Sequence, residues 1–156
     1  MGFGVNRVSG AAQAPGTVDA DSSRGWARTA GPAPALDFVL IRKLAEDLSP
    51  DAALRFLSDY LGMLPGRWTR ILLALEDDDT EVALDALVSL RITSSMTGAL
   101  EAEGHCRQLE SFVHAGWFAK ARTEASELGP KLERLFCAAP DLLKQARNSL
   151  GTVSVR

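Results

Sequence analysis

Few side chains of this sequence could perform covalent or metal chemistry, and those few stand far apart. His105 and His114 supply imidazoles, which can accept a phosphoryl group, move a proton or bind a metal ion. The two histidines are nine residues apart in a segment with helical periodicity, so they do not share one helix face. No cluster of His, Cys, Asp or Glu has metal-ligand spacing, and no nucleophile stands beside a base. We therefore expect no metal ion, no cofactor and no catalytic residue of these kinds.

The composition is that of one ordinary globular domain. The chain has 156 residues, of which 46% are apolar and 24% charged, enough for a single core. Its net charge of −3 argues against a general nucleic-acid binder, which carries a basic patch or stripe. No apolar run approaches the roughly 18 to 20 residues that span a bilayer, and the N-terminus lacks the apolar region of a secretory signal. We expect a cytoplasmic protein that contacts neither nucleic acid nor membrane.

The two cysteines are expected to be unpaired. Cys106 and Cys137 match no metal-ligand spacing, and two cysteines allow only one bridge. In a reducing cytoplasm we expect both of them to be free, buried thiols.

The chain divides into a tail, a helical domain and a short C-terminal end. Residues 1–34 are rich in Gly, Ala, Pro, Ser and Thr without apolar periodicity, so we expect them to be disordered. Trp26 is the one residue of this segment that could anchor to something, and we interpret it as a stray aromatic of the tail. Residues 35–147 carry the helical pattern, and residues 148–156 are expected to fray.

Apolar residues at helical spacing predict an all-α domain. No sustained strand alternation and no Asn-Gly or Asp-Gly turn occurs in the chain. We expect helices at about 36–48, 50–76, 80–96, 99–115, 118–135 and 141–146. The second carries a heptad-like seam of Leu54, Leu57, Leu61, Leu64, Trp68, Ile71 and Leu75. The apolar stripe of the first is Leu36, Val39, Leu40, Lys43 and Leu44.

Local signals place the helix ends and connect them into a fold. Ser49 can cap the second helix with Pro50 at its first position, Asp79 can cap the third, and Gly98 can end it. Since the seam keeps its phase through Pro65, we expect one kinked helix there rather than two. Narrow seams and short links predict an antiparallel up-and-down four-helix bundle with an extra N-terminal helix. Bundles host many functions, so the pattern alone assigns none.

The spacing of residues from Asp79 to Glu110 resembles that of the histidine-containing phosphotransfer (HPt) domain family. In that family an Asp precedes the phospho-accepting His by nine residues, as Asp79 precedes Val88 here. A Leu, a cation, two small residues, a Gly-Ala pair and a Leu-Glu step follow in the family. The matching residues are Leu90, Arg91, Thr93, Ser94, Gly98, Ala99, Leu109 and Glu110. The resemblance covers about residues 36–143 and implies the family's helical bundle and a role in phosphorelay signalling.

The residues that would perform the family's chemistry are the ones that differ. Val88 stands at the position of the acceptor His and Ile92 at that of a Gly, and residues 80–104 contain no His. The family moves a phosphoryl group between a His nitrogen and a receiver-domain Asp, which needs a lone pair and a nearby cation. Val88 has no lone pair and cannot accept a phosphoryl group. Arg91 stands at the position of the family's cation, but an Arg on a helix face is usually only solvated. We therefore expect this chain not to be an enzyme.

One face of the expected third helix is the candidate partner-docking surface. Leu84, Leu87, Leu90 and Ser94 take the core side of this helix, and Glu81 begins the opposite stripe. If the family geometry holds, Val88 and Ile92 form an exposed apolar patch, and such patches often mark interaction sites. Their burial under the tail or a shifted helix is the alternative. The candidate docking face comprises Asp85, Val88, Arg91, Ile92 and Ser95.

Three functions fit these observations. In the first, the chain is an HPt-like protein of two-component signalling that docks or regulates a receiver or histidine-kinase domain without taking the phosphoryl group. In the second, phosphotransfer proceeds through a non-standard histidine, His105 or His114. In the third, the chain is a helical oligomerisation module unrelated to phosphorelays, with Val88 and Ile92 as a self-association seam. The sequence leaves a homo-oligomer open.

Overall fold

The computed structural model of the chain describes Trp26 and residues 34–154. The predicted disordered tail, apart from Trp26 and Pro34, therefore lies outside the described residues. All regular elements of the described part are helices, which confirms the all-α prediction. They are α2 (Phe38–Asp47), α3 (Pro50–Glu76), α4 (Thr80–Thr97), α5 (Leu100–His114), α6 (Phe118–Cys137) and α7 (Ala139–Ser154).

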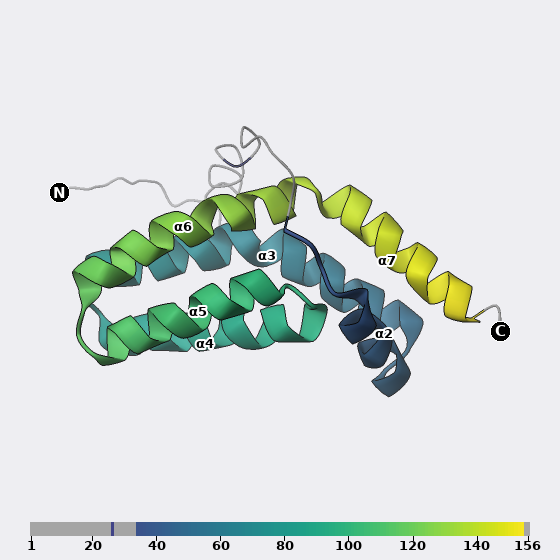
Figure 1. The fold of residues 1–156 in the computed structure, drawn as a ribbon, viewed down its shortest axis with the longest axis horizontal. Coiled ribbons are helices and arrows are strands. Elements are labelled where there is room, and N and C mark those ends of the chain that lie inside the picture. Colours follow the sequence, from purple (N-terminus) through teal and green to yellow (C-terminus); the bar gives the residue numbers. More distant parts are fainter. Residues whose placement is uncertain (1–25, 27–33, 155–156) are drawn as a thin grey trace, which may run out of the picture.

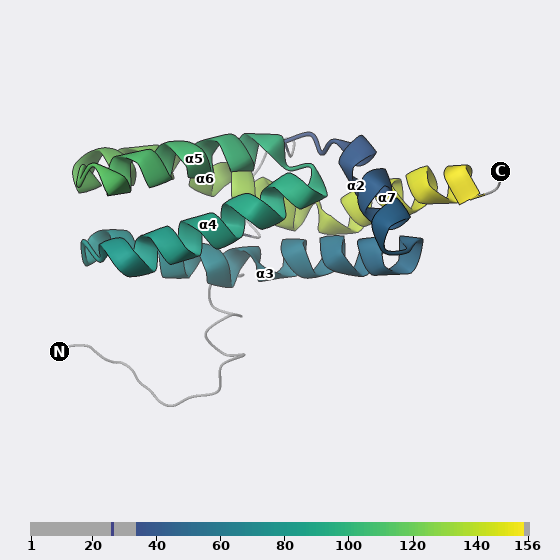
Figure 2. The same cartoon turned by 90° about the horizontal axis from the view of Figure 1, so that it is seen from below.

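Four of these helices form the predicted antiparallel up-and-down bundle. The helices α3, α4, α5 and α6 run alternately along one long axis and are joined by short turns (Figures 1 and 2). The long helix α3 extends beyond the other three, and α2 and α7 pack against that extension. The extra N-terminal helix of the prediction is thus α2, and a second addition, α7, closes the same end of the molecule.

The bundle core follows the apolar seam of α3. Leu57, Leu61, Leu64, Ile71 and Leu75 are each at most 1% exposed, as the seam predicts. They meet a line of Leu and Ala side chains from the other helices, among them Leu87, Leu90, Ala102, Leu109, Ala121, Leu128 and Leu132. The spacing of three and four residues keeps these side chains on one face of each helix, so the helices can share one core.

The capping residues act as the sequence indicates. Ser49 accepts a hydrogen bond from the backbone N–H of Ala52, at 3.0 Å, with Pro50 opening α3. Asp79 caps α4 by accepting from the N–H of Val82, at 3.1 Å. Both caps satisfy backbone donors that a helix start leaves without a partner.

Two prolines lie inside helices without ending them. Pro65 is an interior residue of α3, which confirms one helix rather than two; the kink stays a prediction. The freed backbone is partly satisfied, because the hydroxyl of Thr69 donates to the carbonyl of Pro65 at 3.0 Å. Pro130 lies likewise within α6, next to Gly129, whose missing side chain leaves room for the Trp68 ring.

The prediction for the C-terminal end is wrong. Instead of a short helix at 141–146 and a frayed segment from 148, α7 runs from Ala139 to Ser154. Leu142, Ala146 and Leu150 are buried at a spacing of four residues, so this helix has an apolar stripe of its own. Arg42 of α2 donates to the hydroxyl of Ser149 at 2.8 Å, which adds a polar link between the two added helices.

The apolar stripe predicted for the first helix is partly wrong. Leu36 is buried but precedes the helix, which begins only after the capping residue Asp37. Val39 is 58% exposed, whereas Ile41, absent from the predicted stripe, is 1% exposed. The face that α2 buries is set by its packing against α3, α4 and α7, and Ile41 and Leu44 are its buried pair.

Trp26 and Cys137 also depart from the predictions. Trp26 is 8% exposed rather than a stray aromatic, and its ring packs edge-on against Phe136 with centroids 5.8 Å apart. Cys106 is buried as expected, but Cys137 is exposed because it is the last residue of α6, beyond the apolar stripe that ends at Leu135. Both thiols are free, and that of Cys137 donates to the Trp26 carbonyl at 2.7 Å.

Candidate functional site

The candidate docking face lies along the outer side of α4. Ile92 is 46% exposed, Asp85 is exposed, and Val88 and Ser95 are half-buried. The opposite side of the helix is the core side, with Ala83, Ala86, Leu87, Leu90, Ser94 and Thr97 buried. Among the described residues no shifted helix buries Ile92, whereas burial under the tail, the other form of the alternative, falls on residues outside the described ranges.

Met96 extends the apolar part of this face. It follows Ile92 by one helical turn and is 38% exposed. Val88, Ile92 and Met96 thus share one side of α4 at a spacing of four residues, and we call them the α4 apolar stripe. The prediction missed Met96, although continuing the four-residue spacing by one step would have found it.

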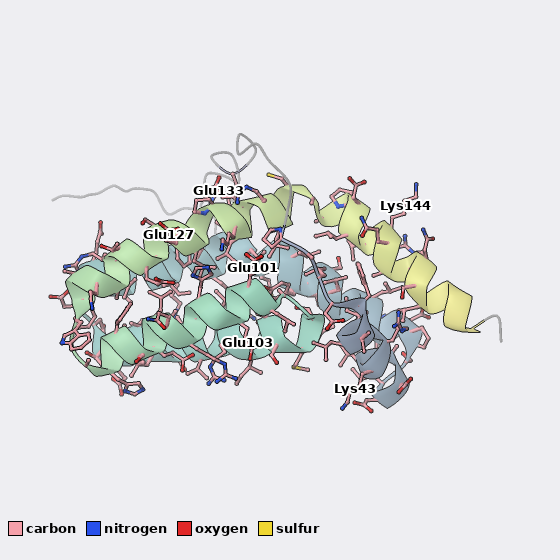
Figure 3. The ribbon with its side chains drawn as sticks, viewed as in Figure 1. Lys43, Glu101, Glu103, Glu127, Glu133 and Lys144 are labelled. Atoms are coloured by element: carbon pink, nitrogen blue, oxygen red, sulfur yellow. The ribbon has the colours of Figure 1, made fainter. Side chains whose placement is uncertain are left out.

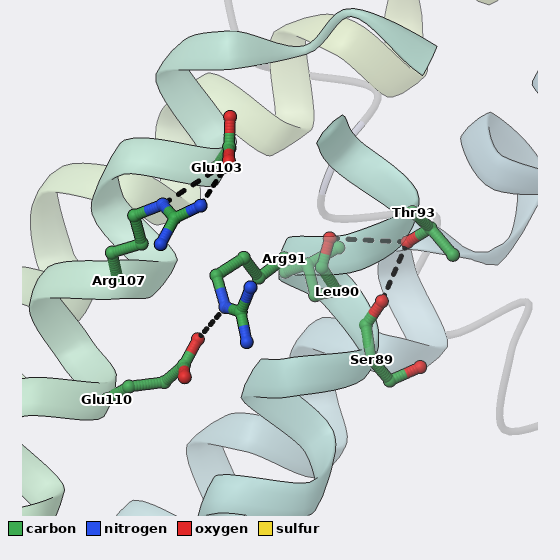
Figure 4. Close-up of polar contacts among 7 residues, drawn as sticks. All are labelled: Ser89, Leu90, Arg91, Thr93, Glu103, Arg107 and Glu110. Carbon is green, nitrogen blue, oxygen red and sulfur yellow. Dashed lines mark hydrogen bonds and ion pairs between the residues drawn. The ribbon is translucent and has the colours of Figure 1, made fainter. Parts of the chain in front are cut away.

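Arg91 does not behave as the solvated helix residue that the sequence suggested. Its side chain is 24% exposed, and its Nε donates to Glu110 of α5 at 2.6 Å (Figure 4). On α5, Glu103 pairs with Arg107 at 2.9 Å on the same side of the helix pair (Figure 4). The candidate cation is thus already neutralised, and it forms the α5 border of the docking face rather than its centre.

Two arginines that the prediction missed form the opposite border, on α3. Arg67 donates to the hydroxyl of Ser89 at 2.8 Å, and Arg70 pairs with Asp85 at 2.9 Å. Both contacts join α3 to the exposed side of α4, so the docking face is framed by charged groups on each side. The only sequence signal was two arginines three residues apart on a predicted helix, which is common on solvated surfaces.

Buried hydroxyl groups hold α4 in place beneath the docking face. The Tyr60 hydroxyl and the Ser94 Oγ are 2.7 Å apart in the core, which links α3 to α4. Burial raises the pKa of Tyr60, so the phenol keeps its proton. Thr93 and Thr97 donate to carbonyls of the preceding turn of α4. Thr93 and Ser94, the two small residues of the family resemblance, thus form hydrogen bonds within α4 and between α4 and α3, respectively.

The histidines lie on α5, away from the outer side of α4. The Nδ1 of His105 lies 2.6 Å from Glu124, and its Nε2 lies 3.0 Å from the Lys131 ammonium. Lys131 also pairs with Glu101, which Figure 3 labels on α5. A lysine that donates to Nε2 requires the ring proton on Nδ1, so both nitrogens of His105 are engaged. His114 is exposed at the end of α5.

The described part of the chain contains no group of three or more His, Cys, Asp or Glu residues placed to hold a metal ion. Burial raises the pKa of Cys106 to about 12, so this thiol is not a thiolate near neutral pH. No helix within the described ranges is both long and apolar enough to cross a membrane.

Comparison with known proteins supports the fold. The crystal structure of histidine-containing phosphotransfer protein B (HptB) from Pseudomonas aeruginosa PAO1 superimposes with a TM-score of 0.62 at 23% sequence identity. The match covers 75% of this chain and 97% of that chain. No family model and no curated protein matches the sequence. The chain therefore has an HPt-like helical fold, as the spacing of its α4 and α5 residues predicted.

Proposed function

We propose that this chain is an HPt-like module of phosphorelay signalling that docks a receiver or histidine-kinase domain without accepting a phosphoryl group. Its HPt-like fold supports the signalling role. The absence of a histidine from residues 80–104 supports the second half of the proposal, because no side chain of α4 offers an imidazole lone pair. Such a protein would act as a competitor, adaptor or regulator for domains that exchange phosphoryl groups with other partners.

The exposed α4 apolar stripe is the observation that carries this proposal. Ile92 and Met96 are 46% and 38% exposed at neighbouring turns, with half-buried Val88 in line. Apolar side chains surrounded by charged pairs are typical of an interface core with a polar rim. Bulky apolar groups at the acceptor position favour contact with a partner surface over chemistry on it.

Phosphotransfer through a non-standard histidine is the less favoured function. The Nε2 of His105 already accepts from Lys131, and its Nδ1 faces Glu124. A phosphoryl group would have to displace one of these partners. His114 is exposed but lies at the end of α5, outside the docking face.

The docking surface can be tested with two charge substitutions. We expect Val88→Asp and Ile92→Asp each to weaken binding to a cognate receiver or kinase domain by about 10- to 100-fold, since each places a carboxylate in an apolar contact. Calorimetric titration of purified receiver and kinase domains from the same organism measures the effect. Circular dichroism of both variants establishes that the helices are retained.

Leu48→Asp is the matched control. Leu48 is 59% exposed at the end of α2 and lies outside the docking face, so this variant should bind as the wild type does. The proposed surface is contradicted if all three substitutions weaken binding equally, and also if none of them weakens it. Light scattering on the same samples separates docking from self-association: a wild-type oligomer that becomes monomeric on Ile92→Asp would favour the oligomerisation module instead.

A further inference from the structure

A small cationic pocket lies beside the docking face. It has a volume of about 240 Å³ and is lined by Met63, Arg67, Arg70, Ala86 and Ser89. The residues come from α3 and α4, so the pocket follows the seam between the two helices. Its lining contains two arginines and a hydroxyl group but no carboxylate.

The hydrogen-bond donors of Arg67 are incompletely used. Its Nη1 donates to Ser89, and within the described part of the chain its Nη2 meets the sulfur of Met63 at 4.0 Å, a weak acceptor. Its Nε is buried and has no hydrogen-bond partner among the described residues. A buried guanidinium nitrogen without an acceptor is unfavourable, and a rotation of the Arg67 side chain toward an anion in the pocket would give this nitrogen an acceptor.

The second arginine is held by a bond that can be exchanged. Arg70 pairs with Asp85, but their side chains are 51% and 73% exposed. Exposed pairs of this kind contribute little stability, since water screens them and both side chains remain mobile. A more highly charged anion in the pocket could therefore replace Asp85 as the partner of Arg70.

We propose that this pocket binds a phosphoryl group presented by the docked partner, and that it makes docking sensitive to the partner's phosphorylation state. This inference rests on the proposed docking function and adds to it a binding site with its own ligand. Ser89 directly follows Val88, so a partner that covers the α4 apolar stripe brings its surface to the mouth of the pocket. No covalent step is involved, because the phosphate stays on the partner.

The chemistry of the lining favours a phosphoryl group over a carboxylate. Two guanidinium groups and the Ser89 hydroxyl supply donors in several directions, and a tetrahedral dianion offers three terminal oxygens to meet them. The two positive charges match the charge of a phosphate near neutral pH. A carboxylate would satisfy one arginine and leave the second with Asp85.

Inorganic phosphate is the first probe, because it needs no partner protein. In a two-dimensional NMR titration of the full chain, we expect saturable shifts of the Arg67 Nε–H and Ser89 amide signals. Arg67→Gln and Arg70→Gln should weaken apparent phosphate affinity by at least about tenfold, the loss of one charged hydrogen bond. Arg55→Gln, an exposed arginine of the same helix, should leave it unchanged.

Asp85→Asn is the control for loss of phosphate binding through misfolding. It removes the competing carboxylate, so phosphate should bind about three- to tenfold more tightly, an effect that damage to the fold would not produce. The pocket is not a phosphate site if phosphate causes no saturable shift, or if Arg67→Gln binds phosphate as the wild type does. Acetate binding as tightly as phosphate would overturn the assignment to a phosphoryl group.

A receiver domain activated with beryllofluoride, a stable mimic of its phosphorylated state, tests the link to docking. We expect the activated domain to bind more tightly than the unmodified one, and Arg67→Gln to remove this difference. Phosphate binding with no preference for the activated domain would overturn the phosphorylation sensitivity while leaving docking untouched. If the wild type binds neither receiver nor kinase domains, the proposed function is wrong, whether or not the pocket binds inorganic phosphate.

Discussion

Incubated with a phosphorylated receiver domain that carries labelled phosphate, the wild-type protein is expected to take up no stable label, whereas the double variant Val88→His, Ile92→Gly should become labelled. The imidazole at position 88 would supply the missing lone pair, and the glycine would let the partner's acyl phosphate approach it. Val88 is half-buried on the outer side of α4, so a histidine there can reach a docked partner. The expected change is from background to nearly stoichiometric transfer.

The single variants separate the two contributions. Val88→His alone should be labelled slowly, because Ile92 crowds the approach, and Ile92→Gly alone should not be labelled. A glycine inside α4 costs about 1 kcal/mol of stability, so the helical content of each variant has to be compared by circular dichroism. Labelling is followed by gel electrophoresis under alkaline conditions, where phosphohistidine persists.

Stable labelling of the wild type would contradict the proposed function, because it would show that the protein accepts a phosphoryl group. Wild-type labelling that disappears in His105→Asn or His114→Asn would establish phosphotransfer through that histidine. We expect neither result, because both ring nitrogens of His105 are engaged and His114 lies at the end of α5, outside the docking face.

Gly98→Ala is expected to destabilise the protein by about 2–4 kcal/mol, which sums a left-handed backbone strain, a steric overlap and a weakened hydrogen bond. Gly98 ends α4 with φ of +84°, a conformation that side chains rarely adopt. A Cβ atom there would also overlap the backbone carbonyl of Asp37. The segment before α2 passes over this turn, and the Asp37 N–H donates to the Gly98 carbonyl at 2.9 Å.

Urea unfolding measures this loss, and Gly104→Ala is its control. Gly104 lies inside α5 with open space around the position of a Cβ atom, so alanine there should stabilise the protein by about 0.5–1 kcal/mol. Equal effects of the two substitutions would contradict both the backbone strain and the overlap with Asp37 that are expected at Gly98.

The helical elements were predictable because their signals are local. The seam of α3 alternates three and four residues over most of its length, and caps such as Ser49 and Asp79 act on backbone groups within one turn. The end of α4 at Gly98 was predictable for the same reason. The prediction that the chain frays from residue 148 was wrong. Leu142, Ala146 and Leu150 stabilise a helix there only because α2 and α3 pack over them.

The candidate docking face was predictable in part. Helical geometry placed Asp85, Val88, Ile92 and Ser95 on one side of α4, and the absence of a histidine there is a property of the sequence alone. What the sequence could not indicate is which neighbours each side chain meets. Arg91 turned out to pair with Glu110, nineteen residues away, a contact that depends on how α4 lies against α5.

The sequence by itself determined the four helices of the bundle, their core faces and the absence of a histidine from the third helix of the prediction, because these depend on residue identity and local spacing. The tertiary structure decided which charged groups border the apolar stripe of Val88 and Ile92. Arg67 and Arg70 meet Ser89 and Asp85 only because α3 and α4 pack side by side, and no periodicity encodes that pairing across helices. The pocket between them exists for the same reason.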